Sequence, residues 1–394
     1  MVHDNFIIKF LLLLFWNFYY KTIYLFSILM KSFFCYILSS FFLSIYILSS
    51  TDGLMKTVAQ FRFTAEGCLK SARYRYGDLY GISFLPEFKK EIWSERSMIK
   101  SNSCRLPRKV NLYSICDSYL WNYIKSDTIF CGVKSYKFSR WGFDGSMKIK
   151  LDTSQFNVLL IEVAERYFRI TPTANYIDKI QFLRNTSSYL STIGSIQTKT
   201  AGLSIRKEDL LIIYKMINNP DINQNLEFNL SDYPVFTPFK EMKALLNYRM
   251  FGHVPQEVSV IDGCPYLFLR ETVDPLSAQS SFSPLADEEV GDIVNRLNAV
   301  FKYYRQNGFK EVLFSVIPNP VSVIYPTYNN YNDIIRRVQN HQDLLMPMIN
   351  ICDKLDSSRY QVFHNSDSHW NSTGFNLWVN EVNSYLKTIY KKRF

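Results

Sequence analysis

The sequence predicts an α/β fold with a mainly parallel sheet, and three observations lead to this prediction. Short apolar runs alternate with amphipathic helical patterns along the chain, as they do in βαβ units. The run from Phe156 to Val163 is continuously apolar, which is typical of a parallel strand covered on both faces. The run from Val110 to Ile115 ends abruptly before Asp117 and Ser118, so we expect a strand, a turn and a helix there, in that order.

The N-terminal segment has a different composition from the rest of the chain. From Asn5 to Ser50 the only charged residues are Lys9, Lys21 and Lys31. The uncharged stretch from Ser32 to Leu48 approaches the length that spans the hydrocarbon core of a membrane. This composition predicts one membrane-spanning helix or a secretory signal.

Two interpretations of this segment stay open. Lys31 before the apolar stretch and Asp52 after it favour a retained helix with a cytoplasmic N-terminus, by the positive-inside rule. Alternatively, translation starts at Met30 and the stretch is a cleaved signal peptide. In both cases residues 1–51 are the membrane anchor or signal segment. The predicted α/β domain, residues 52–394, then lies outside the cytoplasm, in the periplasm or cell envelope.

The remaining elements follow from apolar periodicity and turn residues. Residues 55–109 are a polar lead-in. Residues 167–256 are an insertion or cap, because their composition shifts to Asn, Ser, Thr and Tyr. A turn at Asp262 and Gly263 predicts a hairpin over 257–269. The other expected elements are a helix at 119–125, strands at 128–133, 309–317 and 360–363, and helices at 287–307, 328–353 and 371–390.

Composition and charge exclude several classes of protein. The 394 residues are 47% hydrophobic and 20% charged, which excludes a disordered chain. Lys and Arg number 45 against 35 Asp and Glu, a net charge of +10. The basic residues are scattered, so we expect no nucleic-acid partner, whereas acidic glycans or an anionic membrane face fit equally well. The five histidines and seven cysteines show no H-x-H, H-E-x-x-H or C-x-x-C spacing, so neither a metal nor a cofactor is expected.

The cysteines also bear on the cellular compartment. Export of the domain permits a disulfide. Cys68 and Cys104 are the expected pair, because both lie in polar, loop-like sequence. Free, partly buried thiols are the alternative.

Ser118 is the first candidate for chemistry. It follows a predicted strand, at the edge of a parallel sheet where ligands bind. A helix beginning at Tyr119 would direct its N–H groups and positive dipole end toward an oxyanion beside the Ser118 hydroxyl. The alternative is that Asp117 and Ser118 only cap this helix.

The second candidate is the polar segment from His364 to Gly374, HNSDSHWNSTG, just before the closing helix. Asp367 lies two residues before His369 and can orient its imidazole while His369 takes the proton from Ser118. Such an arrangement makes a weakly nucleophilic hydroxyl able to attack an ester. Alternatively, Asp367 or Asn371 caps the last helix and His369 lies on the surface.

Together these segments resemble the SGNH/GDSL superfamily of serine esterases and acetyltransferases. Within it they resemble the bacterial alginate O-acetyltransferase-like proteins of cell-surface polysaccharide acetylation, which carry a D-x-H-W motif. SICDSYLW resembles the nucleophile block usually written G-D-S, and DSHWNSTG resembles the acid–histidine block. GCPYLFLRETVDP and VLFSVIPNPVSVIYP resemble two family segments between these blocks. The resemblance covers residues 75–390 and implies a three-layer SGNH-like sandwich.

The resemblance implies a role for each member of a triad. Ser118 would be the nucleophile and its backbone N–H the first oxyanion donor. His369 would be the general base and then the general acid, and Asp367 its orienting carboxylate. Two features depart from the family. Cys116 replaces the glycine that usually precedes Asp-Ser, and the D-x-H-W block follows the serine block, whereas it usually precedes it in the alginate acetylation relatives. A triad is a matter of geometry, so either order can close the same site.

Further oxyanion donors and a substrate wall are also expected. Gly142, Gly145 and Asn319 are candidates for the other oxyanion donors, with turn and loop-cap roles as the alternatives. Trp370 and Trp141 are flanked by polar residues and are candidates for a wall on which a sugar ring stacks.

The resemblance thus implies an exported, membrane-anchored serine O-acetyltransferase that acetylates hydroxyls of a cell-surface polysaccharide through an acetyl–Ser118 intermediate. It also implies a multi-spanning membrane acyltransferase as the acetyl donor, because acetyl-CoA is cytoplasmic. One alternative is a carbohydrate acetyl esterase with the same residues. The other is a catalytically inactive glycan-binding or assembly protein, which Cys116 favours.

Overall fold

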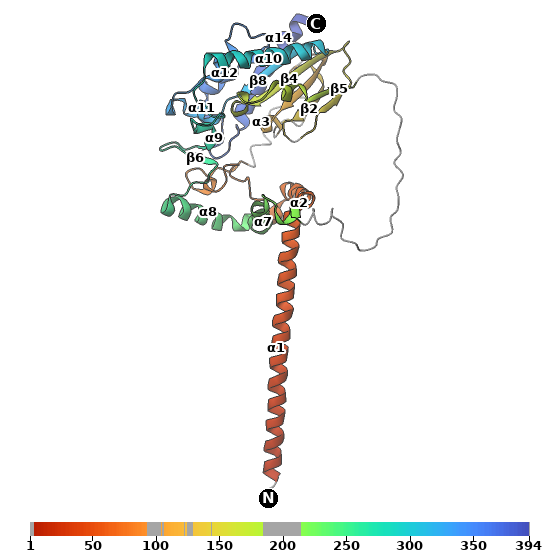
Figure 1. Ribbon diagram of the computed structural model, residues 1–394, viewed down its shortest axis with the longest axis vertical. Coiled ribbons are helices and arrows are strands. Elements are labelled where there is room, and N and C mark those ends of the chain that lie inside the picture. The colour runs from red at the N-terminus through yellow and green to blue at the C-terminus, as the bar shows by residue number, and fades with distance from the viewer. Residues whose placement is uncertain are drawn as a thin grey trace, which may run out of the picture. The chain divides into compact units, whose positions relative to one another are not determined.

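The structure is a computed structural model that describes residues 4–92, 104, 106–121, 123, 129–142, 144–183 and 214–393 (Figure 1). The chain divides into two compact units. The first consists of Met1–Ala72 and Gly194–Phe236, and the second of Arg73–Ile193 and Thr237–Phe394. The residues predicted to carry chemistry all belong to the second unit.

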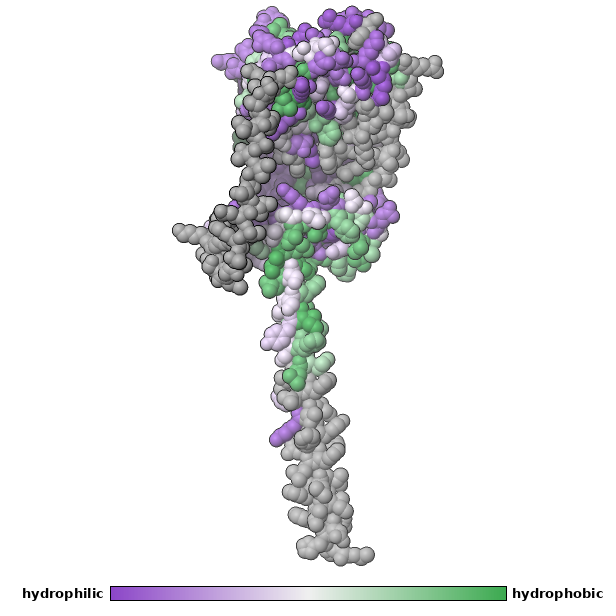
Figure 2. Space-filling model, turned by 90° about the vertical axis from the view of Figure 1, so that its right-hand side faces the viewer, coloured by the Kyte–Doolittle hydropathy of each residue, from purple (hydrophilic) through white to green (hydrophobic). Residues whose placement is uncertain are grey.

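The first unit contains a long apolar helix, α1 (Asp4–Ser50). Its Leu29–Ser50 part is long and apolar enough to cross a membrane, and it is the one such helix in the described part of the chain. Phe33 and Tyr36 in this part are 62% and 74% exposed, and Figure 2 shows hydrophobic side chains along it. An exposed apolar helix of this length suits lipid better than water. This agrees with a membrane anchor or signal segment at the N-terminus.

A segment distant in sequence holds the end of α1. The side-chain amides of Asn219 and Asn225 donate to the carbonyls of Ser50 and Ser49, at 3.1 and 2.8 Å. These bonds satisfy carbonyls that have no partner inside the helix. Residues 214–236, part of the predicted insertion, therefore pack with the apolar helix. The other elements of this unit are α2 (Asp52–Thr64), η1 (Gly67–Leu69), α7 (Ile222–Ser231) and η5 (Pro234–Phe236).

The second unit is built around a five-stranded sheet of order β2-β1-β4-β8-β9. Every neighbouring pair in it is parallel, so the predicted α/β fold with a mainly parallel sheet is confirmed. The strand expected at 128–133 is wrong, because the chain turns at Gly132, where φ is 70°, and the strand begins one residue later. The strands are β1 (Val110–Cys116), β2 (Val133–Arg140), β4 (Phe156–Ala164), β8 (Glu311–Ile317) and β9 (Met348–Ile349).

Helices cover both faces of this sheet (Figure 1). Alternate residues of each strand enter two separate cores. Leu112 and Leu160 pack with α3 (Ser118–Trp121) and α14 (Ser372–Arg393). Tyr113 and Leu159 pack with α10 (Asp287–Gln306) and α12 (Ile334–Gln339). The helices predicted at 287–307 and 371–390 are thus confirmed as α10 and α14.

Two small sheets and several short helices complete the unit. β6 (Val258–Val260) and β7 (Leu267–Leu269) pair antiparallel, which confirms the hairpin predicted around Gly263, where φ is 74°. β3 (Met147–Ile149) pairs parallel with β5 (Ile180–Phe182). The short helices are η2 (Ile82–Phe84), α4 (Glu165–Phe168), α5 (Thr173–Ile177), α8 (Thr237–Leu245), the π-helix η6 (Leu246–Met250), α9 (Arg270–Val273), α11 (Pro320–Ile324), η7 (Pro326–Tyr328), α13 (Cys352–Ser357) and η8 (Arg359–Gln361).

The segment from 328 to 363 differs from its prediction. One helix was expected over 328–353, but the chain there forms α12, the edge strand β9 and the start of α13. Pro347 has no N–H to continue a helix, and its carbonyl accepts the Phe314 N–H at 2.9 Å beside β8. The strand expected at 360–363 is also wrong. Instead η8 is followed by a single bridge between Phe363 and Trp370.

The disulfide joins Cys104 to Cys131, with 5.5 Å between their Cα atoms, and not Cys104 to Cys68, which is exposed and unbonded to sulfur. Cys104 precedes β1 and Cys131 precedes β2. Neighbouring parallel strands begin at the same edge of a sheet, and the Lys109 N–H donates to Gly132 O at 2.9 Å there. The expected pair was wrong because the pairing of β1 with β2 was not evident from the sequence.

Candidate active site

Ser118 begins α3, just beyond the carboxyl end of β1. The turn that places it is fixed by Asp117, which is buried. Asp117 Oδ1 accepts the Tyr119 N–H at 2.8 Å, and its Oδ2 accepts the Ala164 N–H at 3.0 Å. Asp117 therefore caps α3 and ties the ends of β1 and β4 together. The Ser118 hydroxyl is directed to a different partner, His369.

His369 and Asp367 lie on the loop before α14 and meet Ser118 in space. Ser118 Oγ lies 2.6 Å from His369 Nε2, and His369 Nδ1 lies 2.7 Å from Asp367 Oδ1. An ionised carboxylate only accepts hydrogen bonds, so Nδ1 carries a proton. In the neutral imidazole Nε2 is then the acceptor for the Ser118 hydroxyl. The structure thus brings the three predicted residues together, with the contacts that a serine–histidine–aspartate triad requires.

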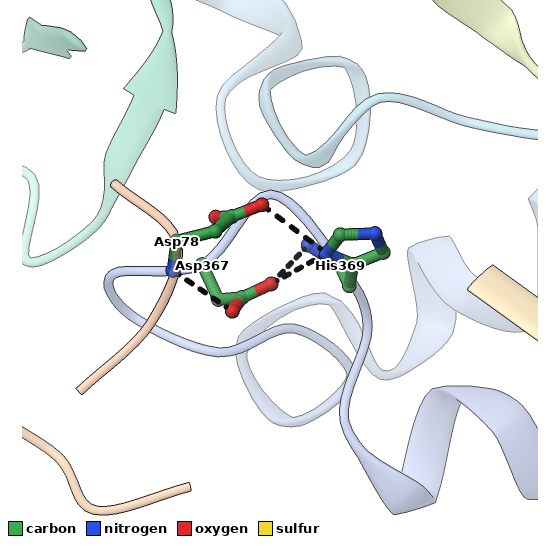
Figure 3. A group of neighbouring side chains, drawn as sticks. All are labelled: Asp78, Asp367 and His369. Carbon is green, nitrogen blue, oxygen red and sulfur yellow. Dashed lines mark hydrogen bonds and ion pairs between the residues drawn. The ribbon is translucent and has the colours of Figure 1, made fainter. Parts of the chain in front are cut away.

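A second carboxylate, that of Asp78, faces the same histidine (Figure 3). Its Oδ2 lies 3.4 Å from His369 Nδ1, and its backbone N–H donates to Asp367 Oδ2 at 3.0 Å. The Ser368 N–H donates to Asp78 Oδ1 at 2.7 Å, and the Ser368 hydroxyl donates to Oδ2. Asp78 therefore contacts both members of the pair, from a segment of the chain that precedes β1.

Gly77 explains how this segment approaches so closely. Its φ is 114°, and a Cβ there would lie 2.0 Å from the Ser366 carbonyl oxygen. A residue with a side chain cannot occupy this position without displacing the loop that carries Asp367. Asp78 could not be predicted from the sequence, because YGDLYG has no spacing that relates it to Ser118 or His369. The one available signal was a glycine beside an acid in a polar lead-in.

The two carboxylates change the protonation of His369. Burial lowers the pKa of His369, but the charge and hydrogen bond of Asp367, together with Asp78, raise it to about 10. Burial raises the pKa of Asp367, but the charge and hydrogen bond of His369 bring it down to about 2. Both shifts favour the charged pair, an imidazolium beside a carboxylate. The form of His369 that acts as a base is the neutral imidazole, whose Nε2 accepts the Ser118 proton, and its share rises with pH.

Replacing Asp78 by asparagine is expected to move the pH dependence of acyl transfer to lower pH. Removing a negative charge beside the imidazole lowers the pKa of His369, so the neutral base is populated earlier as the pH rises. The measurement is kcat/KM for an activated acetyl ester across neutral and alkaline pH, for Asp78→Asn and for the control Asp262→Asn in the exposed hairpin turn. A loss of activity at every pH with an unmoved profile would mean that Asp78 acts only as a support for the loop.

Tyr119 and Arg166 support the histidine loop. The ring centroids of Tyr119 and His369 are 4.8 Å apart, and the Tyr119 hydroxyl donates to the Ser368 carbonyl. Arg166 is 5% exposed, and its guanidinium lies 5.6 Å from the Tyr119 ring centroid. Burial raises the pKa of Tyr119, so its hydroxyl stays a neutral donor. Tyr119 thus holds the loop that carries His369, and Arg166, in the helix that follows β4, packs against the Tyr119 ring.

Asn319 follows β8 at the same edge of the sheet but belongs to a buried network. Its Nδ2 donates to Ser281 Oγ at 3.0 Å, and its N–H donates to Glu165 Oε2 at 2.8 Å. The Ser322 hydroxyl donates to the same Glu165 oxygen at 2.5 Å. Burial raises the pKa of Glu165 to about 7 despite these donors. The contacts of Asn319 are those of a loop cap, the alternative to its predicted role as an oxyanion donor.

Gly142 and Trp370 also lie in settings different from those expected. Gly142 is exposed in the turn after β2, with a φ of 70°, which matches the turn alternative. Trp370 is fully buried. It donates from Nε1 to the Tyr119 carbonyl at 3.0 Å and packs against Phe375, with 6.2 Å between the ring centroids. A sugar ring cannot stack on a buried indole, so Trp370 positions α3 and is no substrate wall.

The cluster of Asp78, Asp367 and His369 is also the one group of potential metal ligands among the described residues, with ligand atoms within 4.8 Å of one another. Every carboxylate oxygen in it already accepts an N–H or O–H from Ser368, His369 or Asp78. A cation on Nδ1 would displace the bond that orients His369. The chemistry of the cluster is therefore that of an acid–base pair, and we assign it no metal or cofactor.

No protein-family model, curated protein or solved structure matches the chain. Membership of the SGNH/GDSL superfamily therefore stays a prediction from the motifs.

Proposed function

We propose that this chain is an exported, membrane-anchored serine O-acetyltransferase of the SGNH/GDSL kind, acting on hydroxyls of a cell-surface polysaccharide. The observation that carries the proposal is the continuous set of contacts from Ser118 Oγ through His369 to Asp367, at 2.6 and 2.7 Å. A serine that only caps a helix needs no histidine on its hydroxyl, and a surface histidine needs no buried carboxylate on its other nitrogen.

The first half of the reaction forms an acetyl–Ser118 ester. Ser118 Oγ attacks the carbonyl carbon of the acetyl donor while its proton passes to His369 Nε2. The tetrahedral intermediate then breaks its bond to the leaving group, which takes that proton from His369. Asp367 remains ionised throughout and stabilises the imidazolium.

The second half transfers the acetyl group to a sugar. A sugar hydroxyl gives its proton to His369 as its oxygen attacks the acetyl–Ser118 carbonyl. The Ser118 oxygen leaves and recovers the proton from His369. Water in the place of the sugar gives acetate, so an esterase would use the same residues and differ only in the acceptor.

Further features support the assignment. The nucleophile follows the first strand of the sheet, the histidine and its acid precede the last helix, and helices cover both faces, as the resemblance implies. Cys116, which replaces the family glycine, is 1% exposed and packs in the core. Its side chain is therefore compatible with an accessible Ser118, and the case for an inactive glycan-binding protein is correspondingly weaker.

The acetyl group, the polysaccharide and the donor come from the resemblance. Acetyl-CoA is cytoplasmic, so an exported transferase needs a multi-spanning membrane acyltransferase that supplies acetyl groups across the bilayer. The apolar α1 would hold this chain beside such a partner.

The test follows the acetyl group on the purified full chain. A fluorophosphonate reports whether any serine is activated, and mass spectrometry of peptides identifies which one. The chain is then given an activated acetyl ester with and without sugar oligomers, and the mass of protein and sugars is measured. Protein already blocked by the fluorophosphonate is the control.

Acetylated Ser118 together with acetylated sugar is the expected result. Acetyl release to water alone, with sugar present, would replace the transferase by an esterase. A folded chain that takes up neither the fluorophosphonate nor an acetyl group would overturn catalysis and favour a glycan-binding role.

A further inference from the structure

The helical segment formed by α8, labelled in Figure 1, and η6 has two faces of opposite chemistry. The inner face carries Lys240, Ala244 and Tyr248, which follow one another at a spacing of four residues. Lys240 Nζ donates to the Tyr80 hydroxyl at 2.6 Å, and Ala244 is buried in a core with Tyr248 packed against it. This face is fixed to the domain by apolar packing and hydrogen bonding.

Ion pairs on the two flanks hold the segment in the same orientation. Glu241 pairs with Lys89, and Arg249 pairs with Glu87 at 2.7 Å. Both partners lie on the stretch just after η2, so the inner face cannot rotate outward without breaking these contacts. The opposite side of the helix therefore stays directed away from the domain.

That opposite side is apolar and exposed, and we name it the outer face. Its residues recur at helical spacing and continue to the residue after η6. They are Phe239, Met242, Leu245, Leu246, Met250 and Phe251, with exposed fractions of 63%, 55%, 45%, 42%, 69% and 74%. A folded domain that meets only water gathers few such side chains in one place, because each one left exposed forgoes the gain of burial.

We propose that the outer face lies on the surface of a lipid bilayer, with its side chains inserted at the boundary between headgroups and acyl chains. A helix with one apolar and one polar face is the structure that binds in this way. Lys243, which is exposed, borders the outer face and suits anionic headgroups. The inference goes beyond the proposed function and does not depend on the chemistry of Ser118.

The chain also supplies reasons to prefer lipid over a protein partner. Its Leu29–Ser50 helix is apolar and long enough to cross a membrane. Phe and Leu on one side of a helix are side chains that insert at a membrane surface.

The test uses the two methionines of the outer face as reporters. The full chain is placed in lipid nanodiscs, one copy per disc, and oxidation of Met242 and Met250 by hydrogen peroxide is followed by mass spectrometry. In the wild type both should oxidise about tenfold more slowly than in the variant Phe239→Gln/Leu245→Gln/Leu246→Gln, whose outer face can no longer insert. The control Leu276→Gln removes a leucine that is 95% exposed elsewhere in the same unit and should leave the protection intact. Circular dichroism melting establishes that each variant is folded.

Equal oxidation rates in the wild type and the triple variant would overturn the proposal, as would a chain that the discs do not retain. Fast oxidation in discs that slows only when another membrane protein is added would show instead that the outer face binds a protein. One copy per disc prevents protection by a second copy of the chain.

Discussion

Alanine in place of Ser118 is expected to lower kcat for acetyl release from an activated acetyl ester by about 10⁴- to 10⁶-fold, the range seen when a triad nucleophile is removed. The Ser118 hydroxyl lies 2.6 Å from His369 Nε2. Without this hydroxyl the proposed acetyl–Ser118 ester cannot form. The measurement is single-turnover acetyl release, together with the intact mass of the protein.

The matched control is Ser139→Ala. Ser139 is a buried serine at the carboxyl end of β2, the strand beside β1, and it donates only a 3.3 Å bond to Gly145 O among the bonds described. Its removal is expected to cost about 1 kcal/mol of stability and to leave kcat unchanged. Retention of full activity by Ser118→Ala would mean that the hydroxyl on His369 is not the nucleophile, and the acyl-enzyme mechanism would have to be abandoned.

The central strands could be predicted from the sequence because strands buried on both faces consist mostly of apolar residues. β1 and β4 have helices on both faces, so nearly every residue is apolar, and the runs over 110–115 and 156–163 mark them within one residue. The edge strands have no such continuous apolar run. β2 alternates irregularly between buried and exposed residues, and β9 has only two residues. An edge strand is identified by the neighbour it pairs with, and that neighbour is not visible in the sequence.

The same limit applies to the candidate site. Asp367 and His369 are close in sequence, so their contact follows from local geometry and could be predicted. Asp78 reaches them through tertiary packing, which depends on the close approach of Gly77 to Ser366. The role in a substrate wall predicted for Trp370 was wrong for a different reason. Its polar neighbours are themselves buried and hydrogen-bonded, as Ser368 is to Asp78, so polarity in the sequence did not mean exposure.

Asparagine in place of Asp367 is expected to reduce kcat by about 10³- to 10⁴-fold, because an amide no longer selects the tautomer in which Nε2 accepts the Ser118 proton. Because Asp78 faces the same imidazole, we expect the smaller loss, about 10³-fold. Its Oδ2 lies 3.4 Å from the same Nδ1 and can replace part of the lost charge. The fold loss in kcat of the double variant Asp78→Asn/Asp367→Asn should therefore exceed the product of the fold losses of the two single variants.

Stability provides an independent readout of the same pair. The pKa of His369 is raised from 6.5 to about 10, so its contribution to stability is complete below pH 6.5 and is lost as the pH rises through about 10. The pKa of Asp367 is lowered from 3.8 to about 2, so its contribution is complete above pH 3.8 and is lost as the pH falls through about 2. The difference in unfolding free energy between the wild type and Asp367→Asn should thus be greatest between pH 3.8 and 6.5.

Combining the two readouts distinguishes catalysis from simple support. If Asp367 only held the loop, through its bonds to the His369 and Asp78 N–H groups, Asp367→Asn would lower stability equally at every pH and its activity would recover at low temperature, where the loop refolds. If Asp367 orients and charges His369, the stability difference shrinks toward alkaline pH, while kcat stays low wherever the variant is folded. The second pattern is expected, because Asp367 Oδ1 lies 2.7 Å from the ring nitrogen and an amide can replace the backbone bonds but not the charge.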